Sequence, residues 1–184
     1  MALTLISTHT ASTDTSIDIT SGIDGTYDSY EFHFENMHPV DNDEGLAFQV
    51  NASNDLKAAG GGFDQTITST MVRAKHGESG TTHQSINYVD AYTQAQAAAY
   101  QRLCNDVGNG DDECVSGVLT LYAPSSTIYV KHFTSRMNEY HAADISMDNF
   151  VAGHINQTLA IPEISFKFTG GAIQAGTIKM FGVS

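Results

Sequence analysis

The sequence predicts an all-β protein, an antiparallel β-sandwich of jelly-roll type, on two main observations. First, hydrophobic residues make up 41% of the 184 residues and charged residues only 16%, while Thr, Ser, Asn and Gly are abundant, which is a β-rich composition. Second, about eight short runs alternate apolar and polar residues and are bounded by Gly, Pro, Asn or Asp. Neither a βαβ rhythm nor an internal repeat is present, so one sandwich domain is expected.

The clearest predicted strand covers residues 27–37. Apolar and polar residues alternate there, which is the pattern of an antiparallel strand with one buried and one solvated face. The apolar face holds Tyr30, Phe32 and Phe34, and the polar face holds Glu31, His33 and Glu35.

Seven further runs show the same period, and the last two are expected to form a hairpin that ends the chain. Gly170-Gly171 and Ala175-Gly176 supply turn signals between those two. The prolines Pro39, Pro124 and Pro162 lie at the edges of apolar runs, where turns belong. The seven runs are residues 46–50, 65–74, 118–122, 128–133, 150–156, 164–168 and 177–183.

The remaining segments lack a strand pattern. Residues 94–103, QAQAAAYQRL, predict a short helical turn in a long connection, with a plain loop as the alternative. Residues 53–62 and 76–87 are expected to be exposed loops, where recognition would occur. Residues 1–16 are interpreted as an extended N-terminal arm that orders on a neighbouring molecule, and residues 17–184 as a single jelly-roll domain.

The charge balance restricts the class of partner. Lys and Arg number 8 against 21 Asp and Glu, which gives a net charge of −13. Such a surface repels phosphate backbones and anionic lipid, so we expect no nucleic acid and no membrane partner, whereas a basic protein surface would suit it. The N-terminal residues carry no signal-peptide pattern and no segment predicts a membrane span, so synthesis as a soluble cytoplasmic chain is expected.

The polar face of residues 31–35 is the best candidate site for chemistry, and it is interpreted as a solvated face. With a rise of roughly 3.3 Å per residue, Glu31 and Glu35 would lie about 13 Å apart, against roughly 5 to 9.5 Å for paired glycosidase carboxylates. Glu31 and His33, about 6.6 Å apart by the same rise, could share a metal ion, but an outward polar strand face is the commoner meaning of this pattern.

Two further patterns predict no bound metal. Eight histidines are scattered without an H-E-x-x-H or C-x-x-C motif. The segment Asn105–Glu113, NDVGNGDDE, is rich in oxygen ligands for Ca²⁺ but does not fit the EF-hand pattern, and an acidic turn is the preferred interpretation. Cys104 and Cys114 flank this segment; a disulfide is open, although cytosolic synthesis favours free thiols. No catalytic, cofactor-binding or metal-binding residue is predicted.

Five phrases, taken together, resemble small structural proteins of marine tailed bacteriophages, notably cyanophages. The resemblance implies a β-sandwich or jelly-roll subunit located in the virion, and it carries over no catalytic position. The phrases cover residues 17–39 (IDITSGIDGTYDSYEFHFENMHP), 48–52 (FQVNA), 119–133 (LTLYAPSSTIYVKHF), 149–156 (NFVAGHIN) and 164–184 (ISFKFTGGAIQAGTIKMFGVS).

Three functions are weighed on this basis. The first is a capsid decoration, or cement, protein: a compact acidic homotrimer that binds the major capsid protein on the outer shell and stabilises it. The second is a tail or fibre component that grips host surface glycans, with Tyr88, Tyr92 and Tyr100 as candidates for a binding pocket. The third is a jelly-roll glycanase, for which the first carboxylates to test would be Glu31, Glu35, Glu139 and Asp144.

Overall fold

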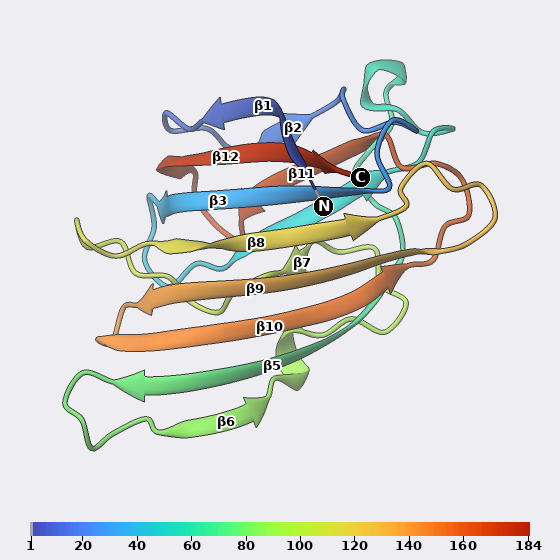
Figure 1. Ribbon diagram of the computed structural model, residues 1–184. Coiled ribbons are helices and arrows are strands. Elements are labelled where there is room, and N and C mark those ends of the chain that lie inside the picture. The colour runs from blue at the N-terminus through green and yellow to red at the C-terminus, as the bar shows by residue number, and fades with distance from the viewer. Residues whose placement is uncertain (1) are drawn as a thin grey trace.

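The computed structural model describes residues 2–184, and its architecture is a sandwich of two antiparallel sheets (Figure 1). The large sheet contains, in spatial order, β1 (Leu3–Thr10), β12 (Ile173–Val183), β3 (Ser29–Pro39), β8 (Val115–Tyr122), β9 (Lys131–His141), β10 (Ile145–Ile155), β5 (Ile67–Gly77) and β6 (Ser85–Tyr88). The small sheet contains β2 (Ile17–Ile19), β11 (Glu163–Phe168), β4 (Leu46–Asn51) and β7 (Gln101–Arg102). The predicted all-β sandwich is therefore confirmed, while its jelly-roll type stays a prediction.

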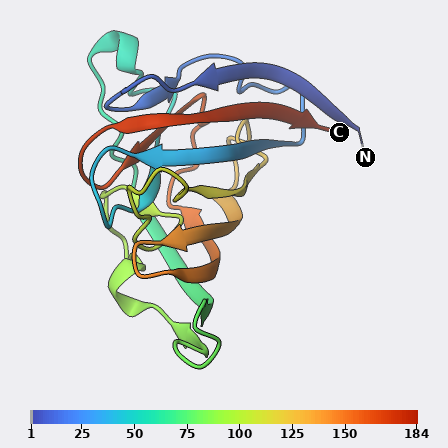
Figure 2. The same ribbon diagram turned by 90° about the vertical axis from the view of Figure 1, so that its left-hand side faces the viewer.

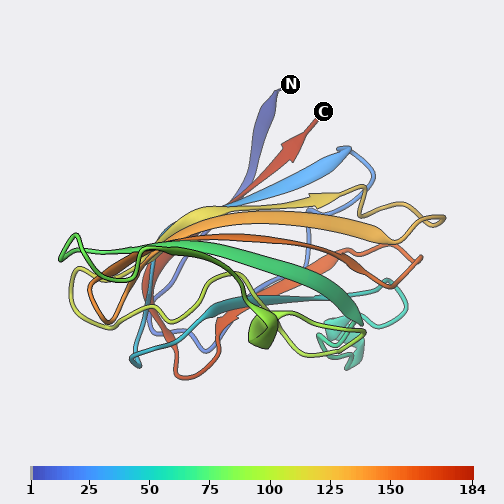
Figure 3. The ribbon, with the colours of Figure 1, turned by 90° about the horizontal axis from the view of Figure 1, so that it is seen from below.

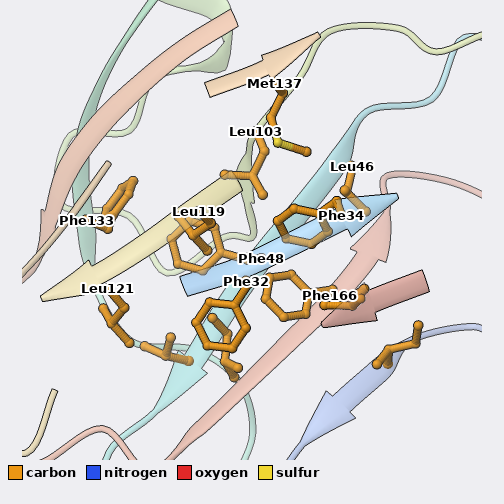
Figure 4. Packing of buried hydrophobic residues seen from close by; sticks show 14 of the residues in the cluster. Phe32, Phe34, Leu46, Phe48, Leu103, Leu119, Leu121, Phe133, Met137 and Phe166 are labelled. Carbon is orange, nitrogen blue, oxygen red and sulfur yellow. The ribbon is translucent and has the colours of Figure 1, made fainter. Parts of the chain in front are cut away.

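The core is formed by the inward faces of the two sheets (Figure 4). Phe32 and Phe34 of β3 pack against Phe166 of β11, with ring centroids 5.3 and 5.1 Å apart. Phe48 of β4 meets Phe133 of β9 edge to face at 5.0 Å. These aromatic contacts join strands of opposite sheets, and each buried Phe contributes roughly 1.5–3 kcal/mol through the apolar surface removed from water.

Strand β3 confirms the alternation that the sequence predicts. Tyr30, Phe32 and Phe34 are buried, whereas the intervening polar residues face outward and are partly or fully exposed. The other predicted runs also fall largely within strands, although residues 128–130 precede β9 and lie in its connection with β8. Alternation over a half-buried strand was thus a sound guide to the existence of these strands.

The predicted C-terminal hairpin is wrong. Strand β11 pairs with β2 and β4 in the small sheet, whereas β12 pairs with β1 and β3 in the large sheet. The short connection between β11 and β12, in which Gly171 adopts a positive φ of 63°, carries the chain across the sandwich. Both strands turn their apolar face to the same core from opposite sides, so their pattern alone does not reveal which sheet each one joins.

The prediction of an arm without strand structure over residues 1–16 is also wrong. Leu3–Thr10 forms β1 and pairs with β12 of its own chain, and Met1 lies outside the described residues. The register shifts between Leu5 and Ser7, so a bulge interrupts the period of two that would have identified the strand. The N-terminal end of β1 and the C-terminal end of β12 project together beyond the other strands of the large sheet (Figures 2 and 3).

Residues 94–103 form no helical turn: residues 94–100 are a loop, as the alternative expected, and Gln101–Arg102 form the short strand β7. The side chain of Gln49 donates from Nε2 to the backbone oxygens of Ala98 and Ala99, at 3.2 and 2.9 Å, and Ala97 pairs with Ile67. These contacts occupy backbone groups that a helix would need for itself. Short 3-10 turns occur instead at Lys57–Ala59 and Asp90–Tyr92.

This loop covers the outward side of the small sheet. Gln49 and the neighbouring Ala47 of β4 point away from the core and are nevertheless completely buried. Residues 76–87, predicted as one exposed loop, instead end β5 and begin β6, with only residues 78–84 between the strands. Among residues 2–184, no helix is long and apolar enough to cross a membrane.

Candidate functional site

The outward face of the large sheet is an extended surface that the chain's own loops leave open, and its charges are paired. This face has two cationic side chains and three carboxylates, whereas the net charge of the whole chain is −13. Most other outward residues of these strands are Thr, Ser and apolar residues. A face with little net charge is typical of the central part of a protein interface. The nitrogen–oxygen contacts are Arg136–Asp148 at 2.8 Å, Lys179–Glu35 at 2.7 Å and His33–Glu31 at 2.8 Å.

One part of this face is distinctly apolar, and we call Val72, Ile86, Tyr88 and Phe150 the β6 patch. Ile86 is 77% exposed and Tyr88 is 57% exposed, while the other two are about 40% exposed. Tyr88 pairs directly with Val72, and Val72 with Phe150, so the side chains form a row across β6, β5 and β10. Contiguous exposed apolar surface of this kind marks interaction sites.

The sequence alone does not reveal the β6 patch. Residues 85–88, SINY, do alternate polar and apolar residues, but they are too few to stand out beside a loop rich in Gly, Ser and His. Of the three tyrosines proposed for a glycan pocket, only Tyr88 belongs to the patch. Tyr92 donates to Asp106, and the Tyr100 hydroxyl donates to Ser165 at 3.0 Å. The structure therefore does not gather the three tyrosines into one pocket.

A shallow concavity of about 360 Å³ lies on the same face, over β5, β9 and β10. His132 and His154 are direct cross-strand partners there, with ring centroids 6.2 Å apart, and Thr68, Thr70 and Thr134 supply hydroxyl groups. Two imidazoles alone leave a metal ion mostly hydrated. The part of the chain that the structure describes holds no group of three or more His, Cys, Asp or Glu arranged around a metal position.

Carboxylates gather at one end of the sandwich, where β3, β5 and β9 end and β8, β10 and β12 begin (Figure 1). This acidic end attracts positively charged surfaces over roughly a Debye length, about 8 Å at physiological salt. Its carboxylates come from four connections: Asp41, Asp43, Glu44, Glu78, Asp111, Asp112, Glu113 and Asp144.

The segment Asn105–Glu113 only partly matches the predicted acidic turn. Asn105 is buried, and its backbone N–H donates to Glu139 Oε2 at 2.7 Å. Asp106 accepts from Arg102 at 3.0 Å, whereas Asp111 and Asp112 are exposed. Asn105 and Asp106, at the start of the segment, are thus hydrogen-bonded to strand residues of the sandwich, and only the end of the segment forms a solvated acidic turn.

The cysteines on either side of this segment are free thiols. Cys104 is buried and its sulfur accepts the backbone N–H of Leu46 at 3.1 Å. Cys114 is half-buried. Burial raises the pKa of both thiols, which keeps them protonated and unreactive near neutral pH.

The four carboxylates considered for a glycanase are not brought together. Glu139 points into the sandwich from β9, where Asn149 Nδ2 donates to its Oε2 at 3.2 Å, and burial raises its pKa to about 7. Glu31 and Glu35 lie on the opposite, outward face of the large sheet. Asp144 lies in the turn between β9 and β10 and accepts from the Tyr140 hydroxyl at 3.4 Å.

Comparison with known protein families, with curated proteins and with solved structures gives no match to this chain. Function is therefore inferred from the chain's own residues and geometry.

Proposed function

We propose that this chain is a structural protein of a tailed-phage virion, made in the host cytoplasm, and that it acts as a capsid decoration protein on the outer shell. The observation that carries the proposal is the open face of the large sheet, on which charges are paired and an apolar patch is exposed. That combination of neutral surface and exposed aromatic residues is typical of surfaces that bind other proteins. The resemblance of five segments to marine phage structural proteins supports the virion role.

The acidic end supports a basic site on the major capsid protein as the partner. Asp111 and Asp112 lie exposed at the tip of the turn before β8, where solvent and a docking surface both reach them. Opposite charge on a shell subunit would steer encounter and fix orientation. A homotrimer that contacts several shell subunits at once would resist their separation, which is how a decoration protein stabilises a capsid.

The first test is the copy number of the protein per purified particle, measured by quantitative mass spectrometry against the major capsid protein. A decoration protein is present in hundreds of copies. A count between a few and a few dozen would contradict the proposal and would favour a tail location.

Binding itself is tested by adding purified protein to capsids that lack it and measuring occupancy after sedimentation. Asp111→Asn combined with Asp112→Asn should lower the affinity for the shell at least tenfold. The matched control is Asp55→Asn combined with Asp64→Asn, which removes two charges at the other end of the sandwich. Equal occupancy for both double variants would refute a role for the acidic end.

The second candidate function is that of a tail or fibre component that binds host glycans. It is favoured by the exposed ring of Tyr88 and by the threonine-lined concavity between His132 and His154, because sugars stack on aromatic rings and hydrogen-bond to hydroxyl groups. Saturation-transfer NMR with host surface glycans, comparing the wild type with Tyr88→Ala, distinguishes it from the first. Transfer that depends on Tyr88, together with a low copy number, would support this second role.

A further inference from the structure

Glu139 places a carboxyl group among apolar neighbours inside the sandwich. Its ladder partners on the two adjacent strands are Val115 of β8 and Met147 of β10, and both are buried. Glu139 itself is only 1% exposed. A carboxylate in such surroundings is costly unless a cation or several hydrogen-bond donors offset its loss of hydration.

The nearby cations do not offset that loss. Among residues 2–184, no Lys, Arg or His forms an ion pair with Glu139. Arg73 of β5 donates to Asn105 Oδ1, and Arg102 of β7 donates to Asp106 Oδ1 at 3.0 Å. Both guanidinium groups are therefore engaged with the segment that follows β7, and neither one neutralises Glu139.

The other titratable groups around Glu139 favour the neutral acid. The negative charge of Asp106 raises the pKa of Glu139 further. The thiol of Cys104 lies beside the carboxyl and is kept protonated by burial, and a thiol is a weak donor. His141, on the same strand, is neutral near pH 7 because burial lowers its pKa. Lys75 lies on β5, two strands away.

The hydrogen bonds around Glu139 and Asn149 are incomplete if the carboxyl is ionised. The Asn105 N–H and Asn149 Nδ2 both donate to Glu139 Oε2, at 2.7 and 3.2 Å. The two remaining oxygens, Glu139 Oε1 and Asn149 Oδ1, are buried and accept from no group in the described part of the chain. An ionised carboxylate has no proton to donate, so both oxygens would be unsatisfied acceptors, which are rare in folded proteins.

We infer that Glu139 is protonated on Oε1 in the folded protein and donates this proton to Asn149 Oδ1. A carboxylic acid and a primary amide are both flat groups that present a donor beside an acceptor, so the two can close a pair of hydrogen bonds. One proton then satisfies both of the unpaired oxygens. Loss of that proton breaks the pair, because Oε1 and Oδ1 both become acceptors.

The same proton controls how firmly residues 103–107 are held. This segment lies outside both sheets and leads into the acidic turn; the Asn105 N–H bonds to Glu139, and the Leu103 and Val107 N–H groups donate to backbone oxygens at 2.8 and 2.9 Å. Opening the segment hydrates an ionised Glu139 without breaking either sheet. Residues 103–107 should therefore open more often as the pH rises, whatever the acidic end binds.

The first test is an NMR titration of the full chain, labelled with carbon-13 in the side-chain carboxyl of glutamate. One carboxyl should titrate near pH 7, and its signal should be absent from Glu139→Gln. The side-chain amide protons of Asn149 should shift with the same midpoint. The matched reporter is the side-chain amide of Asn51, which donates to the buried Glu163 at 2.9 Å and should not follow this titration. A Glu139 carboxyl that titrates below pH 5, or an Asn149 amide that does not follow it, would overturn the inference.

Hydrogen exchange then tests the opening of residues 103–107. The protection of the Leu103 and Val107 amides should fall about tenfold between pH 6 and pH 8, because the closed segment binds the Glu139 proton more tightly than the open one. In Glu139→Gln the side-chain amide supplies a donor to Asn149 at every pH, so the protection should stay constant. Glu163→Gln is the matched control and should behave like the wild type. An equal fall in Glu139→Gln and in the wild type would refute the coupling.

Discussion

At the scale of single residues, the ionisation of Glu139 is coupled to folding. Its carboxyl is buried between the sheets, where loss of hydration raises the pKa from 4.5 to about 7 despite the hydrogen bond from the Asn105 N–H. The proton is therefore bound more tightly in the folded than in the unfolded protein. The stability that this group contributes is fully present below pH 4.5 and is lost as the pH rises through 7.

The substitution Glu139→Gln should remove this pH dependence. Relative to the wild type, the variant's free energy of unfolding should rise between pH 5 and pH 8, by on the order of 2–3 kcal/mol, since one pKa unit corresponds to about 1.4 kcal/mol. Urea titrations of both proteins at the two pH values measure it. Glu35→Gln, on the exposed face of β3, is the control and should show no such change. A wild-type-to-variant difference that is constant with pH would contradict the assignment.

At the scale of strands, Gly153 allows β10 to pack closely against the backbone of β5 and the Phe133 ring of β9. Gly153 of β10 faces the core side of the large sheet, and a methyl group there would lie 2.4 Å from the Thr68 carbonyl oxygen and 2.8 Å from the Phe133 ring. Neither neighbour can retreat easily, because one is backbone in a ladder and the other is a buried ring. The glycine is therefore required by packing.

Gly153→Ala should accordingly lower the free energy of unfolding by about 1–3 kcal/mol through overpacking. Chemical denaturation measures the loss. Gly62→Ala is the matched control, since a methyl group at Gly62 would meet nothing within 4 Å. If both variants were equally stable, the close approach of β10 to Phe133 would be refuted.

The sequence predicts strands well where alternation is long and uninterrupted, and poorly elsewhere. Strand β3 shows seven alternating residues, and its predicted ends lie within two residues of the observed ones, whereas the bulge after Leu5 conceals β1 and the shortness of β6 conceals that edge. Which strands pair with each other is harder still to predict from the sequence. A period of two shows that one face of a strand is buried, but it does not show which sheet the strand belongs to. That is why β11 and β12 were expected to pair with each other.

The same limits apply to the candidate surface. The outward polar face of β3 could be predicted from Glu31, His33 and Glu35 alone. The β6 patch could not, because it assembles side chains from residues 72, 86, 88 and 150, which become neighbours only through the β6–β5–β10 register. Local patterns report what faces outward, whereas a patch depends on which strands lie side by side.

At the scale of the whole molecule, the charge distribution opposes folding at low ionic strength. The net charge is −13, and many of the carboxylates crowd one end of the sandwich. Mutual repulsion among them is weakened when the Debye length falls from about 30 Å at 0.01 M salt to about 8 Å at 0.15 M. The folded state should therefore gain stability as salt is added.

We expect the midpoint of thermal unfolding to rise by several degrees between 10 and 150 mM sodium chloride. Differential scanning calorimetry measures it. The double variant Asp111→Asn with Asp112→Asn should show a smaller rise, because part of the repulsion is already gone. A midpoint that is unchanged or lower at 150 mM would show that repulsion at the acidic end has no effect on stability.

The pairing of β1 with β12 sets the order in which the molecule can be completed. Leu3 and its partner Val183 are 180 positions apart, so during translation β1 emerges well before the strand that it pairs with. At roughly 5–20 residues per second, the wait lasts on the order of ten to forty seconds. Throughout that interval β1 lacks its one ladder partner within the chain, so the nascent chain cannot close this side of the large sheet until β12 has left the ribosome.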